Sequence, residues 1–98
     1  MARIADAELQ HLKQAVPLAD IARSQGRQVF KQGKDLVLLC PFHEEKTPSC
    51  VISPAKNLYH CFGCGAGGSV LDWVMRTDNV SLRRACDALR SQAGGLVT

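Results

Sequence analysis

Residues 40–64 read CPFHEEKTPSCVISPAKNLYHCFGC, and this stretch begins and ends with a short pair of metal-ligand side chains. Cys40 and His43 form the first pair, Cys61 and Cys64 form the second, and seventeen residues separate the two pairs. Two such pairs, joined by a loop long enough for a hairpin, match the tetrahedral geometry that Zn²⁺ adopts in structural sites. Since three cysteines and one histidine fill all four ligand positions, we expect one zinc ion that stabilises the fold and activates no water molecule.

Two other interpretations of these cysteines stay open at this point. The first is that they are ordinary buried residues or a disulfide pair. Glycines flank and separate the sulfurs of Cys61 and Cys64, however, and a zinc knuckle needs glycine because backbone N–H groups turn toward the thiolates. The second is a Cys-x2-Cys redox motif, which would accompany a βαβ pattern, whereas the flanking segments here favour a hairpin. The zinc interpretation therefore fits the sequence better.

Length and composition describe a small domain that gains from a metal. The 98 residues allow one domain, and a chain of this size buries only roughly two-thirds of its unfolded surface. Five cysteines are an odd number for disulfides, and no signal peptide or transmembrane run is visible, so we expect a cytoplasmic protein without membrane contact. The formal net charge is +3, and three thiolates plus Zn²⁺ change it by −3 + 2 = −1. A charge of about +2 is too small to indicate nucleic-acid binding by itself.

Hydrophobic spacing predicts an α+β fold: a small antiparallel zinc β-ribbon sheet flanked by N-terminal and C-terminal helices. We expect helices over 5–16 and 18–25, the second ending at Gly26. The predicted strands lie at 29–30, 36–39, 50–53 and 58–61, with turns over 32–35 and 54–57.

Two more helices should follow the second ligand pair. Ser69 with Asp72 resembles a capping box that opens one helix, and Ser81 precedes another that Gly94 and Gly95 end. On the last helix, Cys86 falls on the apolar face and is expected in the core. We therefore expect a single domain over 1–98. Its ribbon core covers about 28–68, and its flanking helical parts cover 5–25 and 69–93.

The run from Leu39 to Ser49, LCPFHEEKTPS, together with YHCFGCGAGG from Tyr59 to Gly68, resembles the CHC2-type zinc-binding domain of bacterial DnaG-type DNA primases. The resemblance covers roughly 16–93 and extends to primase-like proteins of phages and mobile elements. It implies a domain that precedes a polymerase domain, binds single-stranded template DNA and helps to choose where RNA primers begin.

This chain departs from that family's pattern in two places. The family usually has an aromatic residue after Thr-Pro-Ser, where this chain has Cys50. The polymerase region, with its metal-binding acidic residues, has no counterpart in these residues. We therefore expect no catalytic residues and no polymerase activity from this chain by itself.

Single-strand recognition on a β-sheet combines aromatic stacking with cations that meet phosphates. The candidate DNA contacts are Lys46, Lys56, Tyr59 and His60 in the ribbon and Arg27, Lys31 and Lys34 in the segment entering it. Since neighbouring residues of a strand point to opposite faces, one of Tyr59 and His60 should point inward. His60 should also point away from its neighbour Cys61 and is not expected to be a ligand.

Two functions from different classes agree with these observations. The first is a DNA-binding module of a primase-like system, acting with a polymerase domain or a replicative helicase. The second is a zinc-stabilised protein-interaction adaptor in a replication or mobile-element complex. A basic stripe across Arg27, Lys46 and Lys56 would favour DNA, whereas an exposed apolar patch near Phe62 or Trp73 would favour a protein partner. A third, weaker hypothesis is a redox sensor that releases zinc when Cys61 and Cys64 are oxidised, which would require unusually exposed sulfurs.

Overall fold

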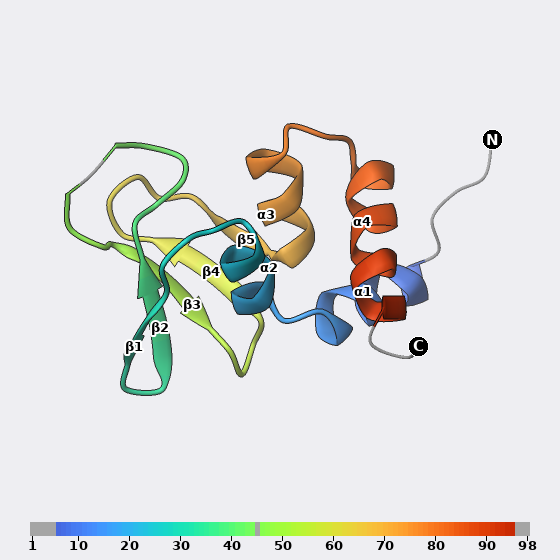
Figure 1. Ribbon diagram of the computed structural model, residues 1–98, viewed down its shortest axis with the longest axis horizontal. Coiled ribbons are helices and arrows are strands. Elements are labelled where there is room, and N and C mark those ends of the chain that lie inside the picture. The colour runs from blue at the N-terminus through green and yellow to red at the C-terminus, as the bar shows by residue number, and fades with distance from the viewer. Residues whose placement is uncertain (1–5, 45, 96–98) are drawn as a thin grey trace.

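The computed structural model describes residues 6–44 and 46–95, and it places an antiparallel sheet beside a group of helices (Figure 1). The helices are α1 (Asp6–Ala15), α2 (Leu18–Ser24), α3 (Val70–Thr77) and α4 (Leu82–Gly95). The strands are β1 (Phe30–Gln32), β2 (Asp35–Leu38), β3 (Cys50–Ser53), β4 (Leu58–Cys61) and β5 (Gly67–Ser69). The predicted α+β class is confirmed.

The sheet is a five-stranded antiparallel meander in which each strand pairs with its neighbour in sequence. Strands β3 and β4 match their predicted ranges, whereas β1 and β2 each differ by one or two residues at their ends. Sequence analysis did not predict β5, because a three-residue segment with two glycines carries no β-propensity signal. It pairs with β4, so that Tyr59 faces Gly68 and His60 faces Gly67.

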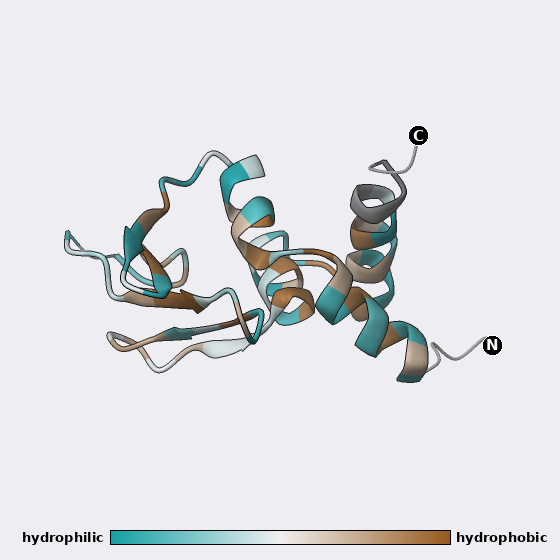
Figure 2. Cartoon of the chain, turned by 90° about the horizontal axis from the view of Figure 1, so that it is seen from below, coloured by the Kyte–Doolittle hydropathy of each residue, from teal (hydrophilic) through white to brown (hydrophobic). Residues whose placement is uncertain are grey.

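One face of the sheet is covered by helices. Helices α2 and α3 lie against it, and α1 and α4 pack behind them, so that the core runs through the middle of the molecule (Figures 1 and 2). Trp73 on α3 is fully buried together with Ile52 of β3 and Leu18 of α2. The opposite face of the sheet carries no helix among the described residues (Figure 1). We call these the inner face and the outer face.

Most predicted helix boundaries are confirmed. Ser69 and Asp72 form a complete capping box, and the hydroxyl of Ser81 accepts a hydrogen bond from the backbone N–H of Arg84. Gly26 follows α2 with φ +84°, as a glycine after a helix end does. The predicted end at Gly94 and Gly95 is wrong, since α4 includes both glycines. Each glycine in a helix costs about 1 kcal/mol, which does not by itself stop the last turn from forming.

The first predicted helix begins at Ala5, which lies outside the described residues. From Asp6 on, α1 follows the prediction and ends at Ala15, where Val16 and Pro17 lead into α2. No helix of the described part of the chain is long and apolar enough to cross a membrane.

Asn57 ties the sheet to the first two helices. It lies in the turn between β3 and β4 with φ +55°, a conformation that asparagine tolerates better than most residues. Its side-chain amide donates to the carbonyl oxygens of Lys13 (2.5 Å) and Val16 (2.8 Å), and its Oδ1 accepts from the backbone N–H of Leu18 (2.7 Å). One side chain thus satisfies backbone groups at the end of α1 and the start of α2.

Candidate metal centre

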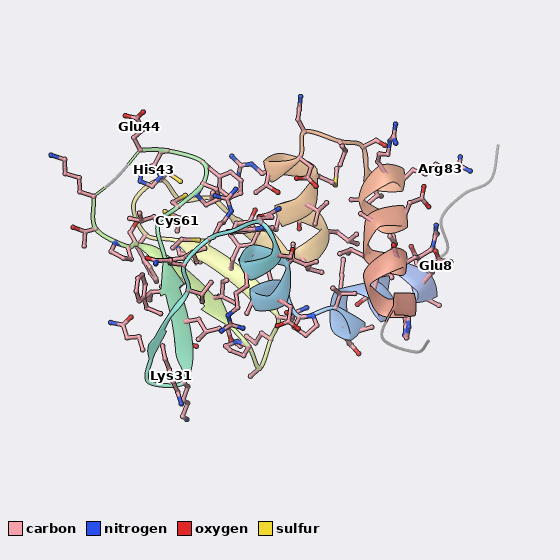
Figure 3. All side chains as sticks on the ribbon, in the orientation of Figure 1. Glu8, Lys31, His43, Glu44, Cys61 and Arg83 are labelled. Carbon is pink, nitrogen blue, oxygen red and sulfur yellow. The ribbon has the colours of Figure 1, made fainter. Side chains whose placement is uncertain are left out.

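Strand pairing brings the two ligand pairs to one end of the sheet. Cys40 follows β2 and Cys61 ends β4, and both of these strands run antiparallel to β3 between them. The carboxyl ends of β2 and β4 therefore lie at the same end of the sheet. The loop after β2 supplies His43, and the turn after β4 supplies Cys64. Figure 3 shows His43 and Cys61 together at this end, with Glu44 pointing away from them. We call it the metal end of the sheet.

The four predicted ligands form one candidate site for a single ion. Their ligand atoms all lie within 4.8 Å of one another. Cys40 Sγ is 3.8 Å from Cys64 Sγ, and Cys61 Sγ is 4.0 Å from His43 Nδ1. Since Zn–S bonds measure about 2.3 Å, the sulfurs of a regular tetrahedral site should be about 3.8 Å apart. The donor set and its spacing therefore fit Zn²⁺, with His43 using Nδ1.

Short backbone loops hold the first cysteine of each pair. The N–H of Phe42 points to Cys40 Sγ at 3.4 Å, and the N–H of Gly63 points to Cys61 Sγ at 3.3 Å. These are the inward N–H groups that sequence analysis expected of a zinc knuckle. They stabilise negative charge on the sulfurs and fix the loops around the site.

Gly63 is required for space and not for a positive φ. A Cβ atom there would lie 2.9 Å from His43 Nε2 and 2.9 Å from Ser49 Oγ, both closer than real Cβ contacts. The unusual backbone conformation falls instead on Gly65, at φ +79°. Ser49 itself was not predicted as part of the site, but its hydroxyl lies 3.4 Å from Cys61 Sγ.

The two buried sulfurs differ in acidity before a metal binds. Burial raises the pKa of Cys40 to about 12, although the N–H of Phe42 opposes this effect. Burial also raises the pKa of Cys61, but hydrogen bonds from Ser49 and from the N–H groups of Cys64 and Gly63 together lower it to about 7. Cys61 is thus the thiol that ionises more readily, and a bound cation would stabilise the Cys40 thiolate.

An aromatic cluster connects the metal end to the helices. Phe42, from the first ligand loop, packs against Tyr59 and Trp73 with ring centroids 5.8 Å and 5.6 Å away, and Tyr59 and Trp73 meet at 5.0 Å. The guanidinium of Arg76 on α3 covers the Phe42 ring at 4.2 Å. Gln25 accepts a hydrogen bond from Trp73 Nε1 and so joins the end of α2 to this cluster.

The structure places the candidate DNA contacts on different parts of the sheet. Tyr59 is only 3% exposed and belongs to the inner face, so its prediction as a surface contact is wrong. His60 is the outward residue of the two, and its ring meets that of Phe62 edge-on at 4.7 Å. Lys31 lies near the end of the sheet opposite His43 and Cys61 (Figure 3), and Lys34 occupies the turn between β1 and β2.

The remaining basic candidates line two hollows. Arg27 and Lys46 line one beside Phe30 and Leu39, while Lys56 lines another together with His60 and Phe62. Phe30 and Phe62 were not predicted as DNA contacts, although an exposed patch near Phe62 was predicted to favour a protein partner. For Phe62 the available signal was alternation with the buried Cys61, whereas β1 is exposed at all three residues and gave no such signal for Phe30.

Comparisons with known proteins agree with this architecture. The family model described as CHC2 zinc finger matches residues 4–97. DNA primase of Pseudomonas putida is 51% identical over 67 residues, which cover 68% of this chain and 10% of that protein. DNA primase of Streptomyces coelicolor is 38% identical over 92 residues, covering 94% of this chain and 14% of that protein.

A solved structure shares the fold as well. The crystal structure of Aquifex aeolicus primase, with its zinc-binding and RNA polymerase domains, matches with a TM-score of 0.79 and 31% identity, over 89% of this chain and 21% of that one. The curated relatives are much longer than this chain, which spans 10% of the Pseudomonas primase and 15% of one from Geobacillus stearothermophilus. From the site geometry and these matches, the chain belongs to the CHC2 zinc finger family and has the fold of a primase zinc-binding domain.

Proposed function

We propose that this chain is a zinc-stabilised module that binds single-stranded DNA on the outer face of its sheet and presents it as template to a primase polymerase domain. The observation that supports this most strongly is a row of side chains across that face. Register aligns Phe30, Val37, Val51 and His60 on neighbouring strands. With about 4.8 Å between strands, β1 and β4 are roughly 14 Å apart, enough for two or three stacked nucleotides.

Aromatic rings stand at both ends of this row. Phe30 at the β1 edge is 48% exposed, and Phe62 beyond β4 is 74% exposed. Exposed aromatic rings offer a flat apolar surface that a ligand can cover. Bases stack on aromatic rings regardless of sequence, and each stack contributes about 1–3 kcal/mol.

The hollow beside Phe62 can receive a base. It measures about 420 Å³ and is lined by His60, Lys56 and Gly67, among others. A Cβ on Gly67 would lie 3.4 Å from His60 Nδ1 and 3.1 Å from the Tyr59 carbonyl oxygen, so the missing side chain keeps the hollow open. In this proposal, Lys56 meets a phosphate and the rings of His60 and Phe62 contact the base.

Basic residues also lie at the β1 end of the row. Lys46 lines a hollow of about 500 Å³ that also contains Phe30, whereas the guanidinium of Arg27 in the same hollow lies 5.8 Å from the centroid of the Trp73 ring and donates to Gln25 Oε1. A single strand that crosses the sheet would meet positive charge at both ends of the row, which suits a chain of phosphates. Lys31 shares its register row with Ile52 and Tyr59 of the inner face, so we leave it outside the proposed surface.

Catalysis belongs to a separate domain in this proposal. The residues matched here correspond to the zinc-binding part of the primase relatives, and the module would supply template binding beside a polymerase domain or replicative helicase in the cytoplasm. The four ligands and their zinc ion hold the sheet in shape for this role.

A fluorescence-anisotropy titration of labelled single-stranded DNA with zinc-loaded protein tests the proposal. We expect binding that weakens as salt rises, with Phe62→Ala and Lys56→Ala each reducing affinity by roughly 5-fold or more. Arg83→Ala is the matched control, because Arg83 is an exposed cation on α4, far from the outer face (Figure 3). Equal losses for Lys56→Ala and Arg83→Ala would contradict a site on this face.

A protein-interaction adaptor remains the second candidate, because apolar residues are exposed around the same hollow. Leu58 lines the same hollow as Phe62 and is itself exposed, whereas Trp73 is fully buried and offers no surface. If zinc-loaded protein binds no single-stranded DNA at low salt, this apolar group becomes the expected contact for a protein partner.

A further inference from the structure

Cys50 is a fifth cysteine next to the metal centre that the four-ligand site does not use. It begins β3, is fully buried, and stands directly opposite Cys61 in the β3–β4 register. Burial alternates along both strands so that Cys50 and Cys61 share the inner face.

The hydrogen-bond pattern shows that this pair can be bridged. The N–H of Phe62 donates to the carbonyl oxygen of Ser49. Ser49 and Phe62, the residues next to Cys50 and Cys61, are therefore a hydrogen-bonded pair of the antiparallel ladder. Cys61 directs its own N–H to Ala66 and accepts from the N–H of Gly65, on the side away from β3. Cys50 and Cys61 are therefore a non-hydrogen-bonded pair, for which the Cα atoms lie about 4.5 Å apart. That separation falls within the range for disulfides, about 4.4–6.8 Å.

We propose that Cys50 and Cys61 are an oxidation site, at which hydrogen peroxide or a similar two-electron oxidant produces a cross-strand disulfide that prevents zinc from binding. While the metal is bound, it keeps the Cys61 sulfur in the ligand cluster. Loss of the metal frees this sulfur to turn toward Cys50. Zinc and Cys50 thus compete for one sulfur atom.

The reaction begins at the ligand that solvent reaches. Cys64 is exposed, whereas Cys40 and Cys61 are buried. Its thiolate attacks peroxide, breaks the O–O bond to give a sulfenic acid, and releases hydroxide. The Cys61 thiolate then attacks the Cys64 sulfur and breaks its S–O bond, so that a disulfide forms. The sulfenic oxygen takes a proton from the solvent and leaves as water, and zinc dissociates.

Exchange moves the bond into the sheet. The Cys50 thiol gives its proton to water, and its sulfur attacks the Cys61 sulfur and displaces Cys64 as a thiolate. Overall, the Cys50 thiol, the Cys61 thiolate and one peroxide give one disulfide, one water molecule and one hydroxide ion, with two electrons passing from sulfur to oxygen. The final bond lies between two residues that are both 0% exposed, where reductants reach it slowly.

Trypsin makes the bond easy to locate in the full chain. Cleavage after Lys34, Lys46, Lys56, Arg76 and Arg84 places Cys40, Cys50 and Cys86 in three different peptides and leaves Cys61 with Cys64 in a fourth. Zinc-loaded protein would be treated with hydrogen peroxide while a chromogenic chelator reports released metal, then alkylated and digested without reductant. Cleavage at Phe62 with chymotrypsin separates Cys61 from Cys64.

We expect the linked pair of peptides 47–56 and 57–76, with the bond at Cys61, and zinc uptake restored only by dithiothreitol. Cys50→Val should remove this product and leave Cys61–Cys64 or Cys40–Cys64 bonds, and Cys50→Ser serves as a second variant if valine impairs zinc binding. Cys86→Ser, which changes a buried cysteine on α4, should behave as the unmodified protein. A wild-type product without Cys50 would overturn the proposal, whatever the variants do. Because no DNA enters this experiment, its result is independent of the proposed DNA binding.

Discussion

The two ends of the sheet are held together by different chemistry. At the metal end, four side chains from two loops converge on a site for one ion. At the opposite end, one neutral side chain, that of Asn57, connects the β3–β4 turn to the backbones of α1 and α2 through three hydrogen bonds. The metal ion contributes a large stabilisation at one site. The Asn57 amide contributes a smaller one, and it also holds the β3–β4 turn in a fixed position against α1 and α2.

The largest expected effect is loss of the metal end. Structural zinc contributes about 10–16 kcal/mol in small peptides, more than the net stability of most domains. We expect a chelator, or Cys61→Ala, to abolish the cooperative thermal transition and the near-ultraviolet circular dichroism of the Trp73 cluster. Cys86→Ala changes an equally buried cysteine and should keep one zinc per chain, at a cost of about 1 kcal/mol. A sheet that melts at the same temperature without zinc would show that the core alone suffices.

Asn57→Ala should have the next largest effect, because it removes the side chain that joins the opposite end of the sheet to α1 and α2. The change removes three hydrogen bonds and leaves alanine at a positive φ, for a combined loss of about 3 kcal/mol in unfolding free energy. Asn57→Gly removes the same bonds but accepts the backbone conformation, so it should lose about 1 kcal/mol less. Urea unfolding at saturating zinc measures both. Equal losses for the two variants would assign the whole effect to hydrogen bonding.

Gly63→Ala sharpens the comparison within the metal end. Its Cβ would press on the His43 ring and the Ser49 hydroxyl, so we expect about 10–100-fold weaker zinc binding in a competition with a chelator of known affinity. Gly65→Ala provides the contrast, since nothing lies within 4 Å of its Cβ and only its φ of +79° opposes the change. It should reduce folding stability more than it disturbs the His43 ligand. If Gly65→Ala weakened zinc binding more than Gly63→Ala does, the backbone conformation at Gly65 would be the main constraint on the site.

Phe42→Leu tests the link between the metal end and the helices, with the smallest effect. Leucine keeps an apolar contact but loses the ring contacts to Tyr59 and Trp73 and the guanidinium of Arg76 over the ring. We expect a loss of about 1 kcal/mol in unfolding free energy with zinc affinity nearly unchanged. A large decrease in zinc affinity would instead show that α3 positions the ligand loop.

The sequence predicted the metal end far better than the opposite end. Ligand spacing is local, so Cys40, His43, Cys61 and Cys64 could be grouped without knowing the fold. The role of Asn57 depends on backbone groups of Lys13, Val16 and Leu18, roughly forty residues earlier in the chain. Sequence patterns do not reveal contacts over such separations.

The surface residues show the same limit. Alternation predicted that one of Tyr59 and His60 points inward, but only the pairing of β4 with both neighbours shows that it is Tyr59. Phe30 and His60 share a face because of a register across four strands, which no local pattern encodes. Strand β5 could not be predicted for a related reason, since Gly67 lies close to the Tyr59 carbonyl of β4 and a Cβ on Gly68 would meet the Asp72 side chain of α3.

Strand β3 supplies none of the four ligands, yet it sets the separation between the strands that do. This has a consequence for changes in chain length. One residue inserted within β3 would shift its pairing with β2 or β4 and turn every following side chain to the other face. Inserted residues in the solvent-exposed turn between β1 and β2 would leave the ligand-bearing strand ends where they are. Related domains should therefore vary in length at that hairpin and keep the four-residue length of β3.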